Sequence, residues 1–397
     1  MTSTRQPTIR LAIDGNEANV HKRVGSNVYA WKILSELYQL TSKSKQWQIT
    51  VLLAHPKVSD LPKSRKNWHY VYIQPTKLWT QWALPIHLAL HRHDYDVFFT
   101  PGHYAPRWSP IPYLSSVMDL AYLHFPDQFR PEDLLQLRSW TKYSVARAKK
   151  VLTISNFSKS EIIKYYGRRA EDIIVAPPAT DFGKSASQQE TKQFFKDHGL
   201  KAGYFLYLGT LQPRKNLQSL LKAYDLFLMQ LLEQTSTGKD KALAKAPQLV
   251  IAGKIGWLNE QFLANINQFI FKEKIILTGF VPAKFKKALY QRAKLSFLLS
   301  LYEGFGIPPL ESLEAGCLPI VANNSSLTEV VGDPQLTVDP QDVPAIAQKM
   351  LEFSQLPESD YQKLLKQRQQ HLKQFSWHKS ARIILRQLKQ IAEEAHD

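Results

Sequence analysis

The stretch Ser300-Leu-Tyr-Glu-Gly-Phe-Gly-Ile-Pro-Pro-Leu-Glu311 decides the fold, because it joins a strand to a helix through a glycine-rich turn. The apolar run 295–300 predicts a buried strand, and a helix is expected to start near Pro309. Gly304 and Gly306 allow the backbone to approach a ligand closely. The free amides at the start of such a helix attract an anion. We therefore predict an α/β domain with an anion site at this turn.

Two carboxylates frame the turn, with Glu303 on the loop and Glu311 in the first turn of the expected helix. Carboxylates accept hydrogen bonds from hydroxyl groups, so the pair suits recognition of a sugar or a ribose. The alternative is that Glu311 only complements the helix dipole while Glu303 is an ordinary surface residue.

A second strand-to-helix turn is Tyr207-Leu-Gly-Thr-Leu-Gln-Pro-Arg-Lys-Asn216. Gly209 permits a tight turn, and Asn216 is expected to cap the amphipathic helix that follows. Arg214 and Lys215 then stand at a helix start, where side-chain cations and backbone amides together would bind a diphosphate. In the alternative interpretation, both are solvated loop cations.

Strand-like and helix-like segments alternate through the chain, which predicts parallel α/β sheets. The expected strands are residues 9–13, 47–54, 97–100, 113–117, 150–154, 204–208, 248–252, 275–278, 295–300 and 318–322. The expected helices are residues 27–40, 134–148, 217–232, one from 309, 342–355, 358–373 and one from 377. Residues 176–190 break the pattern with turn formers and few large apolar side chains, which indicates a linker.

The predicted fold class is therefore α/β, with two Rossmann-like domains whose parallel sheets face a central cleft. We place an N-terminal acceptor-binding domain at residues 1–183 and a C-terminal donor-binding domain at 184–376. A C-terminal helix over 377–397 is expected to pack back on the N-terminal domain. Open α/β sheets bind ligands at the carboxyl ends of their strands, so two such sheets would serve two substrates.

Together these stretches resemble the retaining family-4 glycosyltransferases of the GT-B fold, and more narrowly the bacterial mannosyltransferase-like members. The resemblance covers essentially all of residues 200–377 and, more weakly, the N-terminal half. Besides the two turns, the segments that carry it are Leu249-Val-Ile-Ala-Gly-Lys-Ile-Gly-Trp257, Leu277-Thr-Gly-Phe-Val-Pro282, Asn323-Asn-Ser-Ser-Leu-Thr-Glu-Val330 and Phe375-Ser-Trp377.

The resemblance implies a role for each matching residue of the donor site. Arg214 and Lys215 match the catalytic cations that neutralise the donor diphosphate. Glu303 matches the glutamate on the donor sugar, and Glu311 matches the one on the ribose hydroxyls. The further donor contacts that it implies are Gly209 and Thr210 in the first turn, Gly279, Phe280 and Val281 beside the base, and Gly304, Phe305, Gly306 and Ile307 in the second turn. Related enzymes often carry arginine at the position of Thr210.

The N-terminal half is expected to hold the acceptor. Gly25 and Ser26 open the first long helix and resemble the family's glycine loop, although an ordinary strand-to-helix turn has the same pattern. The stretch Ser116-Val-Met-Asp-Leu-Ala-Tyr-Leu-His-Phe-Pro126 resembles a His-Asp stretch near the acceptor, with Met118 in place of the usual histidine. Methionine accepts no proton, so Asp119, as a catalytic residue, and His124 are the substitutes. For His124 a structural role is the alternative.

The family resemblance implies a nucleoside-diphosphate sugar as donor, with mannose favoured, and transfer with retention to a glycan or lipid-linked acceptor. No cofactor and no metal is expected, because Arg214, Lys215 and helix amides do the neutralising. The dispersed histidines also lack the close spacing of a zinc site.

Charge and cysteine content bear on where the protein works. The chain carries 51 Lys and Arg against 34 Asp and Glu, a net charge of +17, and residues 1–180 account for +11 of it. Cations and tryptophans stand together in Lys63-Ser-Arg-Lys-Asn-Trp68 and Lys77-Leu-Trp-Thr-Gln-Trp82, which favours contact with an anionic membrane. The alternative is that Trp79 and Trp82 belong to the core and the charge only aids solubility. The single cysteine, Cys317, and an N-terminus without an apolar run fit a cytoplasmic protein, in part at the inner membrane face.

Three other functions remain open at this point. One is a GT-B enzyme of another reaction class, such as a nucleotide-sugar epimerase or a phosphorylase. A second is a basic nucleic-acid-binding protein, although no recognisable binding module supports it and no nucleic-acid partner is expected. A third is an inactive scaffold, which the intact pairs Arg214–Lys215 and Glu303–Glu311 argue against.

Overall fold

The computed structural model describes residues 8–102, 104–234, 238–254 and 266–395 of the chain. It divides into two compact units, one made of residues 1–178 with 375–397 and the other of residues 179–374. The expectations that concern Met1–Pro7 and Ile255–Trp257 lie outside the described residues.

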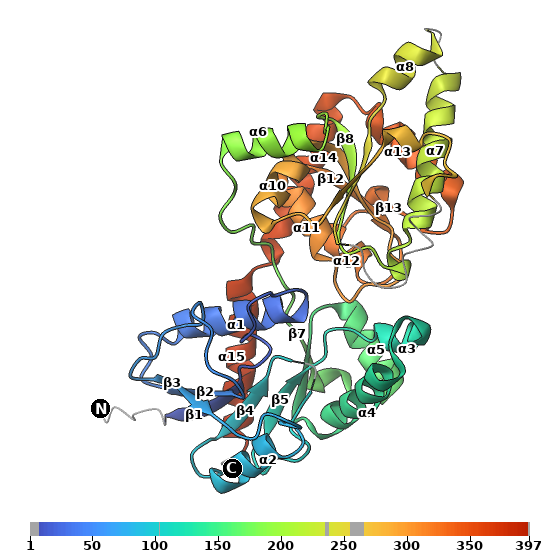
Figure 1. Ribbon diagram of the computed structural model, residues 1–397. Coiled ribbons are helices and arrows are strands. Elements are labelled where there is room, and N and C mark those ends of the chain that lie inside the picture. The colour runs from blue at the N-terminus through green and yellow to red at the C-terminus, as the bar shows by residue number, and fades with distance from the viewer. Residues whose placement is uncertain (1–7, 103, 235–237, 255–265, 396–397) are drawn as a thin grey trace. The chain divides into compact units, whose positions relative to one another are not determined.

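The first unit is built on a seven-stranded parallel sheet in the order β3-β2-β1-β4-β5-β6-β7 (Figure 1). Its strands are β1 Ile9–Asp14, β2 Trp47–Leu53, β3 Trp68–Tyr72, β4 Val97–Thr100, β5 Tyr113–Ser116, β6 Lys150–Thr153 and β7 Ile173–Val175. Its helices are α1 Ser26–Leu40, α2 Ala83–Leu90, α3 Ala121–His124, α4 Pro131–Arg147, α5 Asn156–Tyr166 and α15 Trp377–Glu393. Because β1 pairs with β2 on one side and β4 on the other, the strand order reverses at β1 and opens a crevice at its carboxyl end.

The second unit repeats this plan with a six-stranded parallel sheet in the order β10-β9-β8-β11-β12-β13. Its strands are β8 Tyr204–Leu208, β9 Leu249–Ala252, β10 Ile275–Gly279, β11 Ala293–Leu298, β12 Leu318–Ala322 and β13 Thr337–Val338. Its helices are α6 Gln188–Asp197, α7 Leu217–Glu233, α8 Lys239–Lys245, α10 Ala283–Arg292, α11 Ile307–Ala315, α12 Leu327–Val331, α13 Val343–Ser354 and α14 Glu358–His371. The order reverses between β8 and β11, and the two turns that follow these strands are the ones predicted to hold the donor.

The C-terminal helix α15 belongs to the first unit, where it packs against α1 (Figure 1). Ser376 caps its start, and the Ser380 hydroxyl donates to the carbonyl of Pro177 at 2.6 Å. The rings of Tyr29 and Trp377 meet edge to face with centroids 5.7 Å apart. The chain thus returns to its first sheet after completing the second.

Several boundaries differ from the sequence expectation, and three strands, β3, β7 and β13, were missed. Trp68 was expected on an exposed cationic stretch, but it is fully buried and starts β3. Trp79 is also buried, whereas Trp82 is 60% exposed, so the two do not share one buried face. The helix α11 begins at Ile307 rather than Pro309, because Gly306 ends the turn in the left-handed region at φ 98°.

Among the described residues, no helix combines the length and the apolar character needed to cross a bilayer.

Three glycines tie together the carboxyl ends of the neighbouring strands β8, β9 and β10. The amide of Gly209 donates to Ala252, and the amide of Gly253 donates to Gly279 at 2.8 Å. A Cβ atom at Gly253 would stand only 1.8 Å from the carbonyl oxygen of Gly209. The turn at residues 207–216, which follows β8, can therefore keep its backbone conformation only while residue 253 is glycine.

We expect Gly253→Ala to lower the free energy of unfolding by about 1–3 kcal/mol or more, since backbone atoms must shift to admit the methyl group. Chemical denaturation measures the loss. Gly238→Ala is the matched control, because a Cβ there meets no atom within 4 Å. Equal stability of the two variants would contradict this close approach.

Candidate active site

The two donor turns are joined to each other by backbone and side-chain hydrogen bonds. The amide of Leu301 donates to the carbonyl of Arg214 at 2.8 Å, and Nη1 of Arg214 donates to the carbonyl of Tyr302 at 3.1 Å. Residues Pro213–Lys215 form a single 3₁₀ turn, which Asn216 ends at φ 56°. Arg214 and Lys215 are thereby held beside the second turn.

Asn216 occupies the predicted cap position of α7, but its side chain does not bond the helix amides. Instead its Nδ2 donates to the carbonyl of Pro340 at 2.6 Å, and its Oδ1 accepts from the hydroxyl of Ser219. The residue is therefore held by a distant segment and by a side chain of α7, not by the helix amides.

Glu303 is the centre of this part of the site. Its carboxylate pairs with Nζ of Lys215, lies 3.5 Å from Nη1 of Arg214 and accepts the hydroxyl of Ser300 at 2.7 Å. Burial alone would raise the pKa of Glu303, but the charges of Lys215 and Arg214 outweigh it and lower that pKa to about 2. The group is ionised at neutral pH, and two cations against one carboxylate leave an excess positive charge for an anionic ligand.

Two serines that sequence analysis did not single out hold the second turn in place. The Ser326 hydroxyl lies 2.9 Å from the carbonyl oxygen of Glu303 and 2.8 Å from that of Phe305. The Ser325 hydroxyl accepts the amide of Glu303 at 3.2 Å. At Gly306 a Cβ would meet Leu327 at 2.5 Å, so the turn also requires glycine there.

Glu311 lies in a separate cluster of the same unit. Its carboxylate is buried, accepts Nζ of Lys286 at 3.0 Å and lies 3.4 Å from the hydroxyl of Tyr290. Both partners come from α10, the helix that begins directly after the predicted base-side segment Gly279–Val281. Sequence analysis did not include Lys286, because its contact with Glu311 spans two elements.

The other residues predicted to contact the donor differ in how exposed they are. Phe280 is 71% exposed, whereas the side chain of Val281 packs into the core, so only its backbone remains for a ligand. The carbonyl of Thr210 accepts the hydroxyl of the buried Tyr207 at 3.0 Å, which leaves the exposed Thr210 side chain outward. Gly304, Phe305 and Gly306 are buried, and Ile307 is partly buried.

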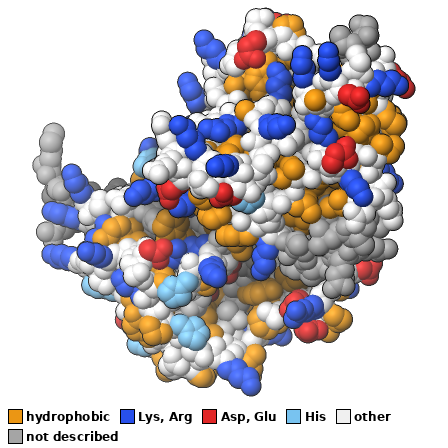
Figure 2. All heavy atoms as spheres, turned by 45° about the horizontal axis from the view of Figure 1, so that its top comes forward, with side chains coloured by type: hydrophobic (Ala, Val, Ile, Leu, Met, Phe, Trp, Pro, Cys, Tyr) orange, Lys and Arg blue, Asp and Glu red, His pale blue; other side chains and the backbone are white. Residues whose placement is uncertain are grey.

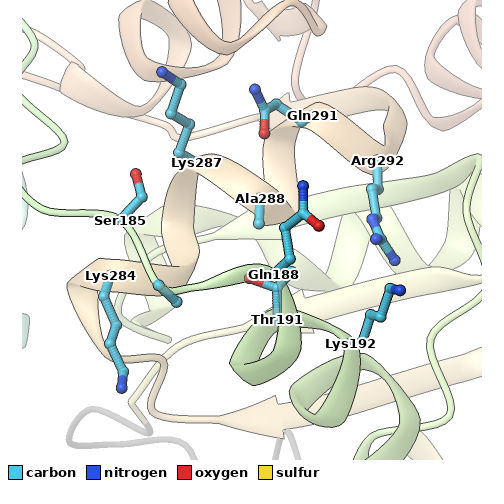
Figure 3. Close-up of a pocket in the computed structure, with 10 residues that line it drawn as sticks. Ser185, Gln188, Thr191, Lys192, Lys284, Lys287, Ala288, Gln291 and Arg292 are labelled. Carbon is cyan, nitrogen blue, oxygen red and sulfur yellow. The ribbon is translucent and has the colours of Figure 1, made fainter.

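A separate cavity of about 420 Å³ lies in this unit between α6 and α10 (Figure 3). Lys192, Lys284, Lys287 and Arg292 line it, and Lys284 pairs with Glu190 at 2.5 Å. None of the residues predicted to bind the donor lines this cavity.

On the acceptor side, the first unit places a polar cluster at the carboxyl end of β1. Gly25 precedes α1 at φ 52°, and the hydroxyl of Ser26 donates to Oε1 of Glu17 at 2.5 Å. The carboxylate of Asp14 accepts both nitrogens of Asn16, while burial raises the pKa of Asp14 to about 7. Of this cluster, sequence analysis had named only Gly25 and Ser26.

Asp119 and His124 both follow β5 but bond different partners. Oδ1 of Asp119 accepts the amide of Ala121 at 3.0 Å. Nε2 of His124 meets the carboxylate of Glu161 on α5, which is 7% exposed, and its ring lies edge-on to Tyr165. Met118 is buried. His124 therefore links α3 to α5, in line with the structural role considered for it.

No group of three or more His, Cys, Asp or Glu side chains is arranged to hold a metal ion within the described ranges.

Comparison with known proteins matches residues 188–371 to the glycosyl transferases group 1 family. The chain is 30% identical over 293 residues to O-antigen chain mannosyltransferase B of Escherichia coli, covering 73% of each protein. It is 26% identical over 251 residues to O-antigen chain mannosyltransferase RfbU of Salmonella typhimurium, covering 62% of this chain and 61% of that one. Its match to the Escherichia coli serotype-specific mannosyltransferase WbdA covers only 28% of that longer protein.

Solved structures share the whole architecture. Sucrose-phosphate synthase of Thermosynechococcus elongatus superposes with a TM-score of 0.70 at 16% identity, covering 96% of this chain and 99% of that one. HepE of Anabaena, solved with UDP and glucose, superposes with a TM-score of 0.66 at 16% identity and the same coverage. The chain has two parallel-sheet units and is 30% identical to a mannosyltransferase over most of its length. It therefore belongs to the group 1 glycosyl transferases and is a glycosyltransferase of the GT-B fold.

Proposed function

We propose that the protein transfers a mannose unit from a nucleoside-diphosphate sugar to a glycan or lipid-linked acceptor, with retention at the anomeric carbon. The observation that carries this proposal is the cluster of Arg214, Lys215 and Glu303 at the strand reversal of the second unit. The names of the mannosyltransferase relatives favour mannose.

The leaving group determines what this site has to do. Negative charge grows on the diphosphate as its bond to the sugar breaks. Arg214 and Lys215, together with the amides of the turn before α11, would stabilise that charge, and such preorganised electrostatics is usually the largest catalytic contribution. Glu303 keeps both cations in place and presents carboxylate oxygens to the sugar hydroxyls.

Retention is consistent with the residues of the acceptor side. Met118 accepts no proton, and His124 is engaged with Glu161. In a front-face reaction the acceptor oxygen attacks from the side that the diphosphate leaves, and the departing phosphate takes the acceptor's proton. Neither a protein nucleophile nor a protein base is then needed. Asp119 would then orient the acceptor rather than attack the sugar.

Peripheral contact with an anionic membrane belongs to the same proposal. A lipid-linked acceptor lies at a membrane surface, and the excess of +11 in residues 1–180 would attract an anionic leaflet. Figure 2 shows Lys and Arg side chains widely spread over the face in view, with acidic side chains sparser.

The direct test is transfer by the purified protein from GDP-mannose, with UDP-glucose as the comparison donor and a lipid-linked oligosaccharide as acceptor. NMR of the product reports the new bond and its anomeric configuration. An inverted linkage would overturn retention. Formation of an epimerised nucleotide sugar or a sugar phosphate in place of a glycoside would overturn the proposed transfer.

We expect Arg214→Ala and Lys215→Ala each to lower turnover at least tenfold, about 1.4 kcal/mol of transition-state stabilisation, because each removes charge that faces the diphosphate. Steady-state kinetics on the folded variants measures this. Lys192→Ala removes an exposed cation of the α6–α10 cavity and should leave turnover unchanged. A similar loss in all three variants would show a general charge effect instead.

We expect the two glutamates to differ in their effect on binding of the bare nucleoside diphosphate. Glu311→Ala should weaken it, because the ribose hydroxyls lose their acceptor. Glu303→Ala should leave it intact or strengthen it, since Arg214 and Lys215 lose the carboxylate that competes with the phosphates. Calorimetry distinguishes the two, and an equal loss of affinity would contradict the assigned roles.

We also expect turnover to stay within about twofold after dialysis against EDTA, because side-chain cations rather than a metal oppose the diphosphate charge. The assay is repeated with added Mg²⁺ and Mn²⁺. Activity that disappears on chelation and returns with either ion would contradict this expectation.

A further inference from the structure

One helix of the first unit presents a row of large apolar side chains to solvent. Leu78, Trp82, Ile86 and Leu90 stand four residues apart, and their exposures are 51%, 60%, 48% and 78%. The amide of Ile86 donates to Trp82, the residue that precedes α2, so Trp82, Ile86 and Leu90 lie along one face of this helix. Leu78, at φ 52°, lies in the turn before the helix, where its carbonyl accepts the amide of Trp82. We call these four residues the α2 row.

This helix already has its core contacts on the other side. Ala83, Leu84 and Leu88 are buried in the hydrophobic core beneath it. The segment Ala83–Leu90 contains no Lys, Arg, Asp or Glu. A helix that is apolar on every side is normally buried, so the α2 row calls for a covering surface.

A second exposed segment adjoins the row. The amide of Arg107 donates to the carbonyl of Thr80 at 2.9 Å, which brings Arg107 and Trp108 beside the start of α2. Both are exposed, Trp108 at 40%. Tryptophan favours the headgroup region of a bilayer, where its ring is apolar and its N–H is wet.

The charge around the row is mainly positive. Residues 61–93 and 97–118 contain no Asp or Glu, whereas Lys77, Arg92 and Arg107 are exposed there. Two acidic residues separate these stretches: Asp94 accepts a hydrogen bond from His91 at 2.8 Å, and Asp96 pairs with Arg10. A surface of this kind matches an anionic covering layer.

We propose that the α2 row inserts into the headgroup region of a leaflet that contains anionic phospholipid, with Lys77, Arg92 and Arg107 against the lipid phosphates. The inference rests on the proposed function, because a lipid-linked acceptor requires the enzyme at that surface. A second copy of the chain fits less well, since a two-fold interface would set these cations against their own counterparts.

The test uses the full-length protein and vesicles of phosphatidylcholine, with and without phosphatidylglycerol. Wild type is expected to float with the phosphatidylglycerol vesicles at low salt and to be released at high salt. The double variant Trp82→Ser/Ile86→Ser should bind at least about tenfold more weakly, because two exposed apolar side chains are lost. Surface changes of this kind leave the fold intact.

Leu135→Gln is the matched control. Leu135 is 70% exposed on α4 in the same unit, but no other large apolar side chain of α4 is exposed. It also stands next to Glu132 and Asp133. Its substitution should not change vesicle binding. The proposal is overturned if wild type fails to bind phosphatidylglycerol vesicles at low salt, or if the double variant binds as wild type does.

Two further readouts separate this inference from the proposed function. Light scattering reports the oligomeric state, and a dimer that the double variant dissociates would assign the row to self-association and overturn the membrane proposal. Calorimetry with the nucleoside diphosphate should give the same affinity for wild type and the double variant. Intact nucleotide binding without vesicle binding refutes only the docking, whereas absent transfer to any acceptor refutes the proposed function.

Discussion

The second unit depends on the ion pairs that Glu303 makes with Lys215 and Arg214. A carboxylate in a largely dehydrated position is unfavourable unless it is paired, and each cation would be equally unfavourable without it. The pairs therefore fix two loops that are far apart in sequence at the one place where the strand order reverses. The bond from Leu301 to Arg214 and the Ser326 hydroxyl reinforce the same arrangement. The proposed donor site is thus formed by the same contacts that join these two turns.

Features formed within one short stretch of sequence could be predicted, whereas contacts between residues far apart in the chain could not. The turns at 207–216 and 300–311 could be predicted because each holds its own signal within about three helical turns of chain, a glycine and two cations in the first and two glycines and two carboxylates in the second. Lys286 and Ser326 were missed because they reach Glu311 and Glu303 from other elements. Asn216 was placed at the correct position, but its bond to Pro340 crosses more than a hundred residues.

Burial was harder to predict than element type. Trp68 follows Lys63, Arg65 and Lys66, so its neighbourhood looks solvated, but a five-residue edge strand needs few buried positions and Trp68 fills one of them. Trp79 and Trp82 both precede α2, but Trp79 packs into the core beneath the helix whereas Trp82 is exposed. Glu17 and Asp14 carried no signal beyond polarity, since their bonds to Ser26 and Asn16 depend on how the loop folds back on α1.

The placement of α15 has a consequence for synthesis on the ribosome. The first unit needs residues 375–397 to cover its sheet beside α1, whereas every residue of the second unit has emerged before them. The second unit can therefore reach its final packing first, although it comes later in the chain than the first sheet. Until α15 is made, the surface of α1 that receives Trp377 stays uncovered, and the nascent first unit is exposed to chaperones and proteases for the whole time that the second is translated.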